Sequence, residues 1–263
     1  MQNALDISVL NLFAFSLLML IPLSINAYFK LSLAKDMLLG VVRMAVQLAL
    51  IGIYLEYLFE LDSWIVNLGW LLVMMLIAAS SVVSKSRLPK SLLLLPVFSG
   101  LFFGLLPILL VVCIAVVQPQ PFYSAQYVIP LSGMLLGNSL SGNIVALQNF
   151  FGSFDARQEE YAGKISLGAS PIYASRPFVE VALQKSLAPI LATMATMGLV
   201  SLPGMMTGQI LSGTSPIIAI KYQLLIMMAI FVMMNISITS CLLLTQRRVL
   251  SPEGRLLCKI RDK

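Results

Sequence analysis

The sequence has no histidine and few charged residues. Lys, Arg, Asp and Glu make up only 11% of its 263 residues, whereas soluble domains carry roughly 25%. The absence of histidine excludes a histidine-ligated metal site and a histidine general base. Apolar residues make up 59% of the chain, so the composition indicates a membrane protein that crosses the bilayer several times.

Cysteine is also scarce, and no nucleotide-binding motif is present. Cys113, Cys241 and Cys258 lie in apolar runs or in the basic tail without paired spacing, which predicts neither a disulfide framework nor a zinc site. The pattern G-x-x-x-x-G-K-[ST] does not occur, so the chain cannot itself cradle ATP phosphates. If the protein uses ATP, the ATPase must be a separate chain.

Seven apolar runs approach or exceed the ~20 residues that a helix needs to cross a bilayer. The sequence before the first run carries only Asp6 and lacks the positive start of a secretory signal, so this run should remain as a span. Backbone groups in lipid must be satisfied within each segment, and the runs lack the alternation of barrel strands. We therefore predict an all-α, polytopic fold, a single membrane domain over residues 1–263, with helices over Ile7–Tyr28, Met37–Phe59, Trp64–Val83, Leu92–Val117, Tyr127–Phe150, Phe178–Ile210 and Pro216–Thr245.

The basic residues predict the orientation of these spans. Fifteen of the 17 Lys and Arg residues lie in one set of loops and in the C-terminal tail, and the other set keeps only Lys221. Because Lys and Arg concentrate on the cytoplasmic side, we expect the N-terminus outside and the C-terminus in the cytoplasm. Anionic lipid headgroups account for the net charge of +6, so no nucleic-acid partner is expected.

The second span carries the strongest charges found inside an apolar run. At about 100° per residue, Arg43 and Gln47 share one face, while Glu56 lies on another face near the outer end. An ionisable residue in a span is by default a functional candidate. Snorkelling of Arg43 and Glu56 to the two headgroup regions is an equally weighted interpretation.

Small and polar residues follow one another in the fifth span. Gly133, Gly137 and Ser141 form a stripe at spacings of four, and Asn138 lies on an adjacent stripe. Such stripes allow helices to approach closely. The pattern favours ordinary packing within one subunit over a seam between copies or the lining of a path.

The sixth span is the one with the strongest helix-breaking signals. Pro189 lies within it, and the segment Gly198–Gly208, GLVSLPGMMTG, adds Pro203 and Gly204. A break near the middle of the membrane or towards its outer half is expected, and it would be the best candidate for a gate. The many methionines of the last two spans, Met205 and Met206 among them, favour flexible core filling over a soft-metal path.

A polar stretch, Glu159–Pro171, separates the fifth and sixth spans. It predicts a short surface helix followed by a stop, within a loop at about 151–177, and a docking place for something outside the membrane. Its part Ala162–Pro171, AGKISLGASP, resembles the cytoplasmic coupling loop of ABC-transporter permeases, where such a helix lies in a groove of the ATPase subunit. Where that pattern has a glutamate six residues before the glycine, this chain has Ala162, with Glu159 and Glu160 nearby.

Along nearly the whole chain from Lys35 to Gln223, the sequence resembles the Fet-type iron-export permease family and its plant relatives, the aluminium-tolerance half-transporters. The shared motifs are Arg43-x-x-x-Gln47, Ile129–Met134 with Gly137-Asn138, Ile165–Pro171, Gly198–Gly208 and Ala219–Gln223, AIKYQ. The resemblance implies a non-catalytic permease in the cell membrane that exports iron or another metal cation from the cytoplasm. It also implies a complex of two permease copies with two ATPase subunits, in which the ATPase, not this chain, binds Mg-ATP.

The resemblance implies a role for each of the candidate residues. The coupling turn would comprise Ser166, Leu167, Gly168, Ala169, Ser170 and Pro171, and the path or gate Arg43, Gln47, Asn138, Gly198, Pro203, Gly204 and Gly208. Glu56 is the leading candidate ligand for the cation because it is the only acid well inside a span, with Met205 and Met206 as weaker candidates. Two alternatives stay open: an ion-coupled secondary transporter that uses Glu56 and the broken sixth span, and a membrane scaffold without transport.

Overall fold

The computed structural model describes residues 8–258, and the described chain contains seven helices long and apolar enough to cross a membrane. Each predicted span corresponds to one of them, so the all-α, seven-span prediction is confirmed. The elements in chain order are α1 (Val9–Ser16), the 3₁₀ turn η1 (Leu17–Met19), α2 (Leu20–Tyr28), α3 (Ala34–Leu61), α4 (Trp64–Lys85), α5 (Lys90–Val111), the π-helical turn η2 (Val112–Val117), α6 (Ala125–Ala156), α7 (Gln158–Ser166), α8 (Pro171–Thr196), α9 (Gly204–Leu211) and α10 (Pro216–Val249).

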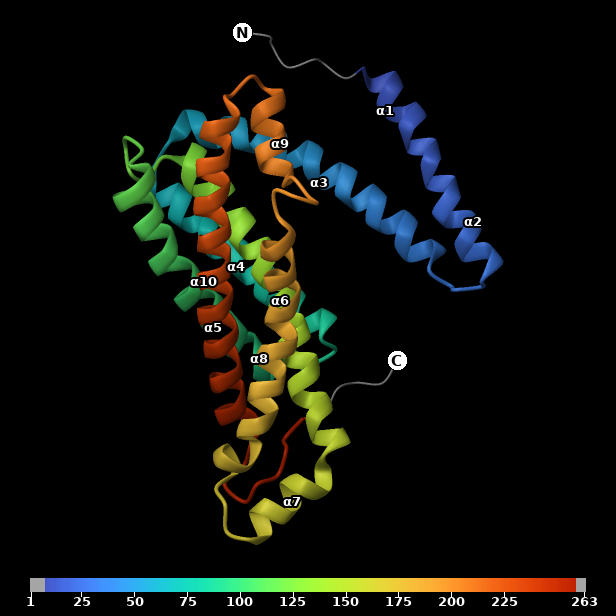
Figure 1. Ribbon diagram of the computed structural model, residues 1–263, viewed down its shortest axis with the longest axis vertical. Coiled ribbons are helices and arrows are strands. Elements are labelled where there is room, and N and C mark those ends of the chain that lie inside the picture. Colours follow the sequence, from blue (N-terminus) through green and yellow to red (C-terminus); the bar gives the residue numbers. More distant parts are fainter. Residues whose placement is uncertain (1–7, 259–263) are drawn as a thin grey trace.

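Five helices, α4, α5, α6, α8 and α10, form one bundle (Figure 1). Its most extensive contact joins α5 to α10, and two glycines of α5 make it possible. A Cβ added to Gly100 would lie 2.7 Å from the Ser237 carbonyl oxygen, and one on Gly104 would lie 2.9 Å from the Ser237 Cβ. The contact between α5 and α10 therefore depends on Gly100-x-x-x-Gly104, a small-residue pair that was not among the predicted features.

α7 lies outside the bundle at one end, and α9 lies at the other (Figure 1); these are called the α7 end and the α9 end. Aromatic side chains hold the base of the α7 end together. The rings of Phe150, Phe154 and Phe178 meet edge to face, and Tyr161 of α7 packs against Phe154 with 5.0 Å between ring centroids. These ring contacts hold α7 against α6 and α8.

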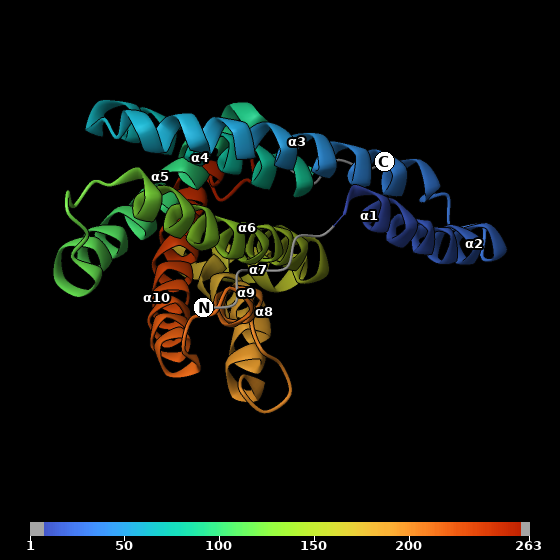
Figure 2. The same cartoon turned by 90° about the horizontal axis from the view of Figure 1, so that it is seen from above.

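The first two spans stand away from the bundle. α1, η1, α2 and α3, which we call the N-terminal arm, project from it as a hairpin (Figures 1 and 2). The arm is attached near the end of α3, where Leu58, 1% exposed, packs with Ala125 and Ile129 of α6. Most side chains of α3 before this contact are exposed.

The sixth span differs from its prediction. The spanning helix α8 begins at Pro171 and runs unbroken through Pro189 to Thr196, so the helix breaks only after Thr196, at Met197–Pro203. At about 1.5 Å per residue its 26 residues extend about 39 Å, which already exceeds the hydrocarbon thickness of about 30 Å. The glycine and proline signals act after the span, at the α9 end, because the helix starts earlier than expected.

Candidate functional site

The structure of the turn between α7 and α8 gives a local role to every residue of the Leu167–Pro171 motif except Leu167. Gly168, with φ +88°, donates from its N–H to the Ile165 carbonyl, and Ala169 donates to the Lys164 carbonyl, the paired bonds of a Schellman helix end. The Ser170 hydroxyl then caps α8 by accepting from the Tyr173 N–H at 3.3 Å, and Pro171 occupies the first helical position, which suits proline. These four residues therefore have local structural roles.

Leu167 is the exception. Its side chain is 89% exposed at the tip of this turn and makes no internal contact that the turn requires. The turn lies beyond the bundle, at the α7 end (Figure 1). A large apolar side chain presented at the tip of a tightly defined turn is suited to docking on another protein.

Three charges order the first two turns of α7. Glu160 accepts hydrogen bonds from Arg157 Nε and Lys164 Nζ, both at 2.7 Å. These bonds, Lys164 first, hold the pKa of the Glu160 carboxyl below its usual range. The Arg157 guanidinium also lies 5.2 Å above the Phe178 ring, so the charges tie α7 to the start of α8.

The segment after α10 folds back against α7. The Tyr161 hydroxyl donates a 3.0 Å hydrogen bond to the Gly254 carbonyl, and burial raises the pKa of that hydroxyl. Gly254 has φ +81°, and a Cβ there would lie 3.2 Å from Ile165. A pocket of about 410 Å³ lies between α7 and this segment, lined in part by Asp155, Gln158 and Arg255.

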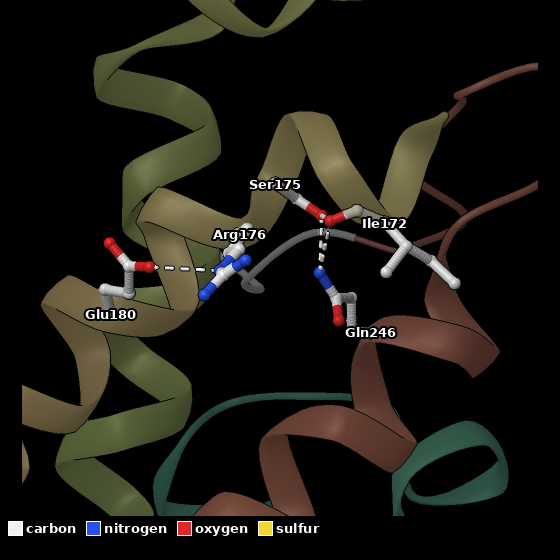
Figure 3. A network of polar contacts seen from close by, with 5 residues as sticks. All are labelled: Ile172, Ser175, Arg176, Glu180 and Gln246. Carbon is white, nitrogen blue, oxygen red and sulfur yellow. Dashed lines mark hydrogen bonds and ion pairs between the residues drawn. The ribbon is translucent and has the colours of Figure 1, made fainter. Parts of the chain in front are cut away.

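A buried amide connects α10 to the start of α8 (Figure 3). Gln246 Nε2 donates to the Ile172 carbonyl at 2.9 Å and to Ser175 Oγ at 2.8 Å. Ile172 and Ser175 lie in the first turns of α8, directly after the Leu167–Pro171 turn. The Gln246 amide therefore connects the first turns of α8 to α10, a link that no sequence pattern had indicated.

Part of the predicted small-residue stripe of α6 lines an open groove, whereas Gly133 faces Met74 of α4. Gly137, Asn138 and Ser141 face a hollow of about 210 Å³ between α6 and α8, with Thr193 and Met234 among its other lining residues. Asn138 is exposed, and its Nδ2 donates to the Met134 carbonyl. The tight contact of α6 with α10 is made instead by Gly142, where a Cβ would lie 2.7 Å from Met234 Cε.

The break after α8 occupies Met197–Pro203 at the α9 end, where Gly198 takes φ +85° and donates to the Ser201 carbonyl. Gln223, from the AIKYQ motif, lies against it, with its Nε2 3.9 Å from Met197 Sδ. The structure thus brings the AIKYQ motif into contact with the break, across 26 positions of the sequence. α9 follows from Gly204 through Met205 to Leu211, and its Met206 is buried, whereas Gly208 is exposed.

The remaining candidates lie on the N-terminal arm. Arg43, Gln47 and Glu56 are exposed on α3, and none of them takes part in the three ion pairs of the described chain. They are therefore not assembled with Asn138 or Gly198 into one site within a single copy. Residues 8–258 contain no cluster of three or more acidic, cysteine or histidine side chains that could hold a metal ion.

The chain matches the family described as Uncharacterised protein family (UPF0014) over residues 9–250. UPF0014 membrane protein YjkA of Bacillus subtilis (strain 168) is 34% identical over 231 residues, which are 86% of this chain and 88% of that protein. Probable iron export permease protein FetB of Escherichia coli (strain K12) is 29% identical over 246 residues, 92% of each chain. Protein ALUMINUM SENSITIVE 3 of Arabidopsis thaliana is 31% identical over 204 residues, 75% of this chain and 71% of that protein.

No solved structure matches the chain. The family match and the length of the alignments confirm the resemblance to the Fet-type permeases and their plant relatives. The seven apolar helices agree with the description of the relatives as membrane proteins. The chain is a multi-pass membrane protein that belongs to the UPF0014 family.

Proposed function

We propose that this chain is the permease subunit of an ATP-driven ABC transporter that exports iron, or a similar metal cation, from the cytoplasm. The observation that carries the proposal is the exposed Leu167 at the tip of the turn between α7 and α8. The name of the relative FetB, probable iron export permease protein, supports iron as the substrate. The chain has no P-loop of its own, so Mg-ATP binds to a separate ATPase chain.

In this proposal the ATPase receives α7 and the Leu167 turn in a groove. Two ATPase subunits act on two copies of the permease, as in the family that the sequence resembles. When the ATPases close, the turn moves the start of α8, and Gln246 carries that movement to α10. The break at Met197–Pro203, at the far end of α8, is the segment that changes conformation in response.

For the path of the cation, we propose the groove beside Asn138 and the segment Gly198–Gly208, which contains the break and the start of α9. Glu56 on α3 is the proposed charged ligand, because a carboxylate suits a hard cation. Met205 and Met206 supply softer donors at the α9 end. Arg43 and Gln47 complete the polar groups of the path, which two copies would assemble.

The test uses the permease reconstituted with the P-loop ATPase that co-purifies with it. We expect metal ion and permease together to stimulate ATP hydrolysis, and Leu167→Ser to abolish the stimulation while the permease stays folded in detergent. Leu211→Ser is the matched control, because Leu211 is a similarly exposed leucine, 73%, at the opposite α9 end. Full stimulation by Leu167→Ser would reject the docking assignment, and the absence of any co-purifying ATPase would reject the transporter class.

A further inference from the structure

Gln47 is a polar side chain that cannot reach either edge of a membrane. It is the fourteenth of the 28 residues of α3, so about 20 Å of helix lies on each side of it at 1.5 Å per residue. Its amide is exposed and makes no side-chain hydrogen bond within residues 8–258. Polar groups facing lipid without partners are costly, so a protein surface must cover this face of α3.

The groove on α6 and α8 also exposes polar side chains, and Asn138 donates only within its own helix, to the Met134 carbonyl. Asn138 is the fourteenth of 32 residues in α6, and it too lies near mid-helix with an exposed amide. Ser141 lies one turn further along, in the same groove. Arg43 lies one turn from Gln47 on α3, on the side away from the Leu58–Ile129 contact, just as Ser141 lies beyond Asn138 on α6.

The two polar pairs also lie at similar distances along their helices from the contact between α3 and α6. Measured along each helix axis from the Leu58–Ile129 contact, Gln47 is about 17 Å away and Asn138 about 14 Å. By the same measure Arg43 is about 22 Å away and Ser141 about 18 Å. An amide can both donate to and accept from another amide, and a guanidinium can donate to a serine hydroxyl, so the pairs are chemically complementary.

The α3 helix of the same copy cannot fill this groove from its present position. Its anchor on α6 is Ile129, and Asn138 comes nine residues later, so the two side chains point in about opposite directions at about 100° per residue. Asp62, directly after α3, fastens this anchor further, because its Oδ1 accepts from the Ala125 N–H at 2.8 Å. Within one copy, α3 could cover Asn138 only if its contacts with Ala125 and Ile129 of α6 were broken.

The N-terminal arm is nevertheless an ordered unit. Asn26 is buried in the last turn of α2, where its Oδ1 accepts from the N–H of Leu33, which directly precedes α3, at 2.9 Å. A soluble partner cannot reach mid-membrane residues, and lipid does not satisfy amides. A second copy of this chain can cover both the exposed face of α3 and the groove. Each copy has one arm and one groove, so a twofold axis would pair the arm of each copy with the groove of the other.

We propose that α3 of one copy lies along the α6–α8 groove of a second copy, exchanged across a twofold axis. Gln47 then faces Asn138 of the partner subunit, and Arg43 faces Ser141 of the partner subunit. The seam rests on the two-copy assembly of the proposed function and specifies where the copies meet. The polar residues of the arm and of the groove become one buried set only in the dimer.

The experiment co-expresses two differently tagged copies, one with Gln47→Cys and the other with Asn138→Cys, and treats membranes with a short bifunctional methanethiosulfonate reagent. Cys258→Ser provides the background, and Cys113 and Cys241 remain because both are buried. We expect a cross-linked species that carries both tags, at least fivefold more abundant than with Ala45→Cys in place of Gln47→Cys. Ala45 is exposed at nearly the same depth but points about 160° away from Gln47 on α3.

Arg43→Cys with Ser141→Cys is the second pair, in case one variant does not reach the membrane. If both pairs link no better than the control, or if the double variant Gln47→Cys/Asn138→Cys links only within one chain, the exchanged seam is wrong. The assay needs neither ATPase nor metal. Cross-linking without stimulated ATP hydrolysis would therefore reject the proposed function alone, and stimulated hydrolysis without cross-linking would reject the seam alone.

Discussion

The Tyr161 hydroxyl of α7 donates a 3.0 Å hydrogen bond to the carbonyl oxygen of Gly254, 93 residues further along the chain. This contact fastens the segment after α10 to the helix proposed to receive the ATPase. Leu250 and Leu256 pair beside it, so the segment forms a small loop against α7. The position of α7 therefore depends on residues beyond the last span.

Loss of this hydrogen bond should loosen the segment and expose Cys258. Tyr161→Phe removes a bond worth about 0.5–1.5 kcal/mol, so we expect Cys258 to react with a maleimide about two- to tenfold faster. Tyr173→Phe, at an exposed tyrosine of α8, should leave the rate unchanged. Burial raises the pKa of the Cys258 thiol, so the wild-type rate should also rise at a higher pH than that of a free cysteine, and Tyr161→Phe should move this rise to lower pH. Equal rates and pH profiles would show that the bond does not hold the segment.

Gly168 is expected to matter through its backbone. A non-glycine residue in the left-handed region costs about 1–2 kcal/mol, but asparagine adopts it more readily. We therefore expect Gly168→Val to lower permease-stimulated ATP hydrolysis severalfold and Gly168→Asn to stay near wild type. No atom lies within 4 Å of a Cβ placed there, so an internal clash would not explain a loss. A loss equal in both variants would point to a direct contact of the glycine with the ATPase.

The orientation of the spans is tested at the two ends of α6. Gln126 and Ala156 are both exposed there, near opposite termini of the helix. In the Cys258→Ser background, Gln126→Cys should react with an impermeant thiol reagent added to intact cells, and Ala156→Cys should react only after permeabilisation. The opposite result would reverse the predicted topology, N-terminus outside and C-terminus in the cytoplasm.

Glu56 is tested by removing its charge without changing its size. We expect Glu56→Gln to reduce iron efflux from reconstituted vesicles severely, with assembly and basal ATP hydrolysis nearly intact, because a hard cation needs the carboxylate. Glu60→Gln is the matched control, one turn nearer the end of α3 and also exposed. Wild-type efflux by Glu56→Gln would mean that this carboxylate only reaches the headgroup region.

Some methionine side chains of the last two helices are buried in the core, and others are exposed. Met233 and Met234 are buried in the core, and Met227 joins them, whereas Met228 is 57% exposed. The favoured interpretation of these methionines as core filling fits the buried ones. The soft-donor role of Met205 and Met206 stays a prediction.

The amino-acid sequence alone determined the seven spans and the turn between α7 and α8. The lengths of the apolar runs fixed the seven spans, because backbone groups in lipid must bond within their own helix. The turn at Leu167–Pro171 is equally local, since a glycine in the left-handed region, a serine cap and a proline at the first helical position act over a few residues. Its prediction as a helix followed by a stop is confirmed by α7 and Gly168.

Tertiary packing decided what the sequence left open. Which glycines meet another helix depends on how α6 is rotated, so Gly142 lies against Met234 while Gly137 faces an open groove. The break lies at the α9 end because α8 begins at Pro171, before the predicted start of the span, and continues to Thr196 before Gly198. The Gln246 and Tyr161 bonds join residues more than 70 positions apart. Such contacts depend on the three-dimensional arrangement of whole helices, which no local pattern of residues specifies.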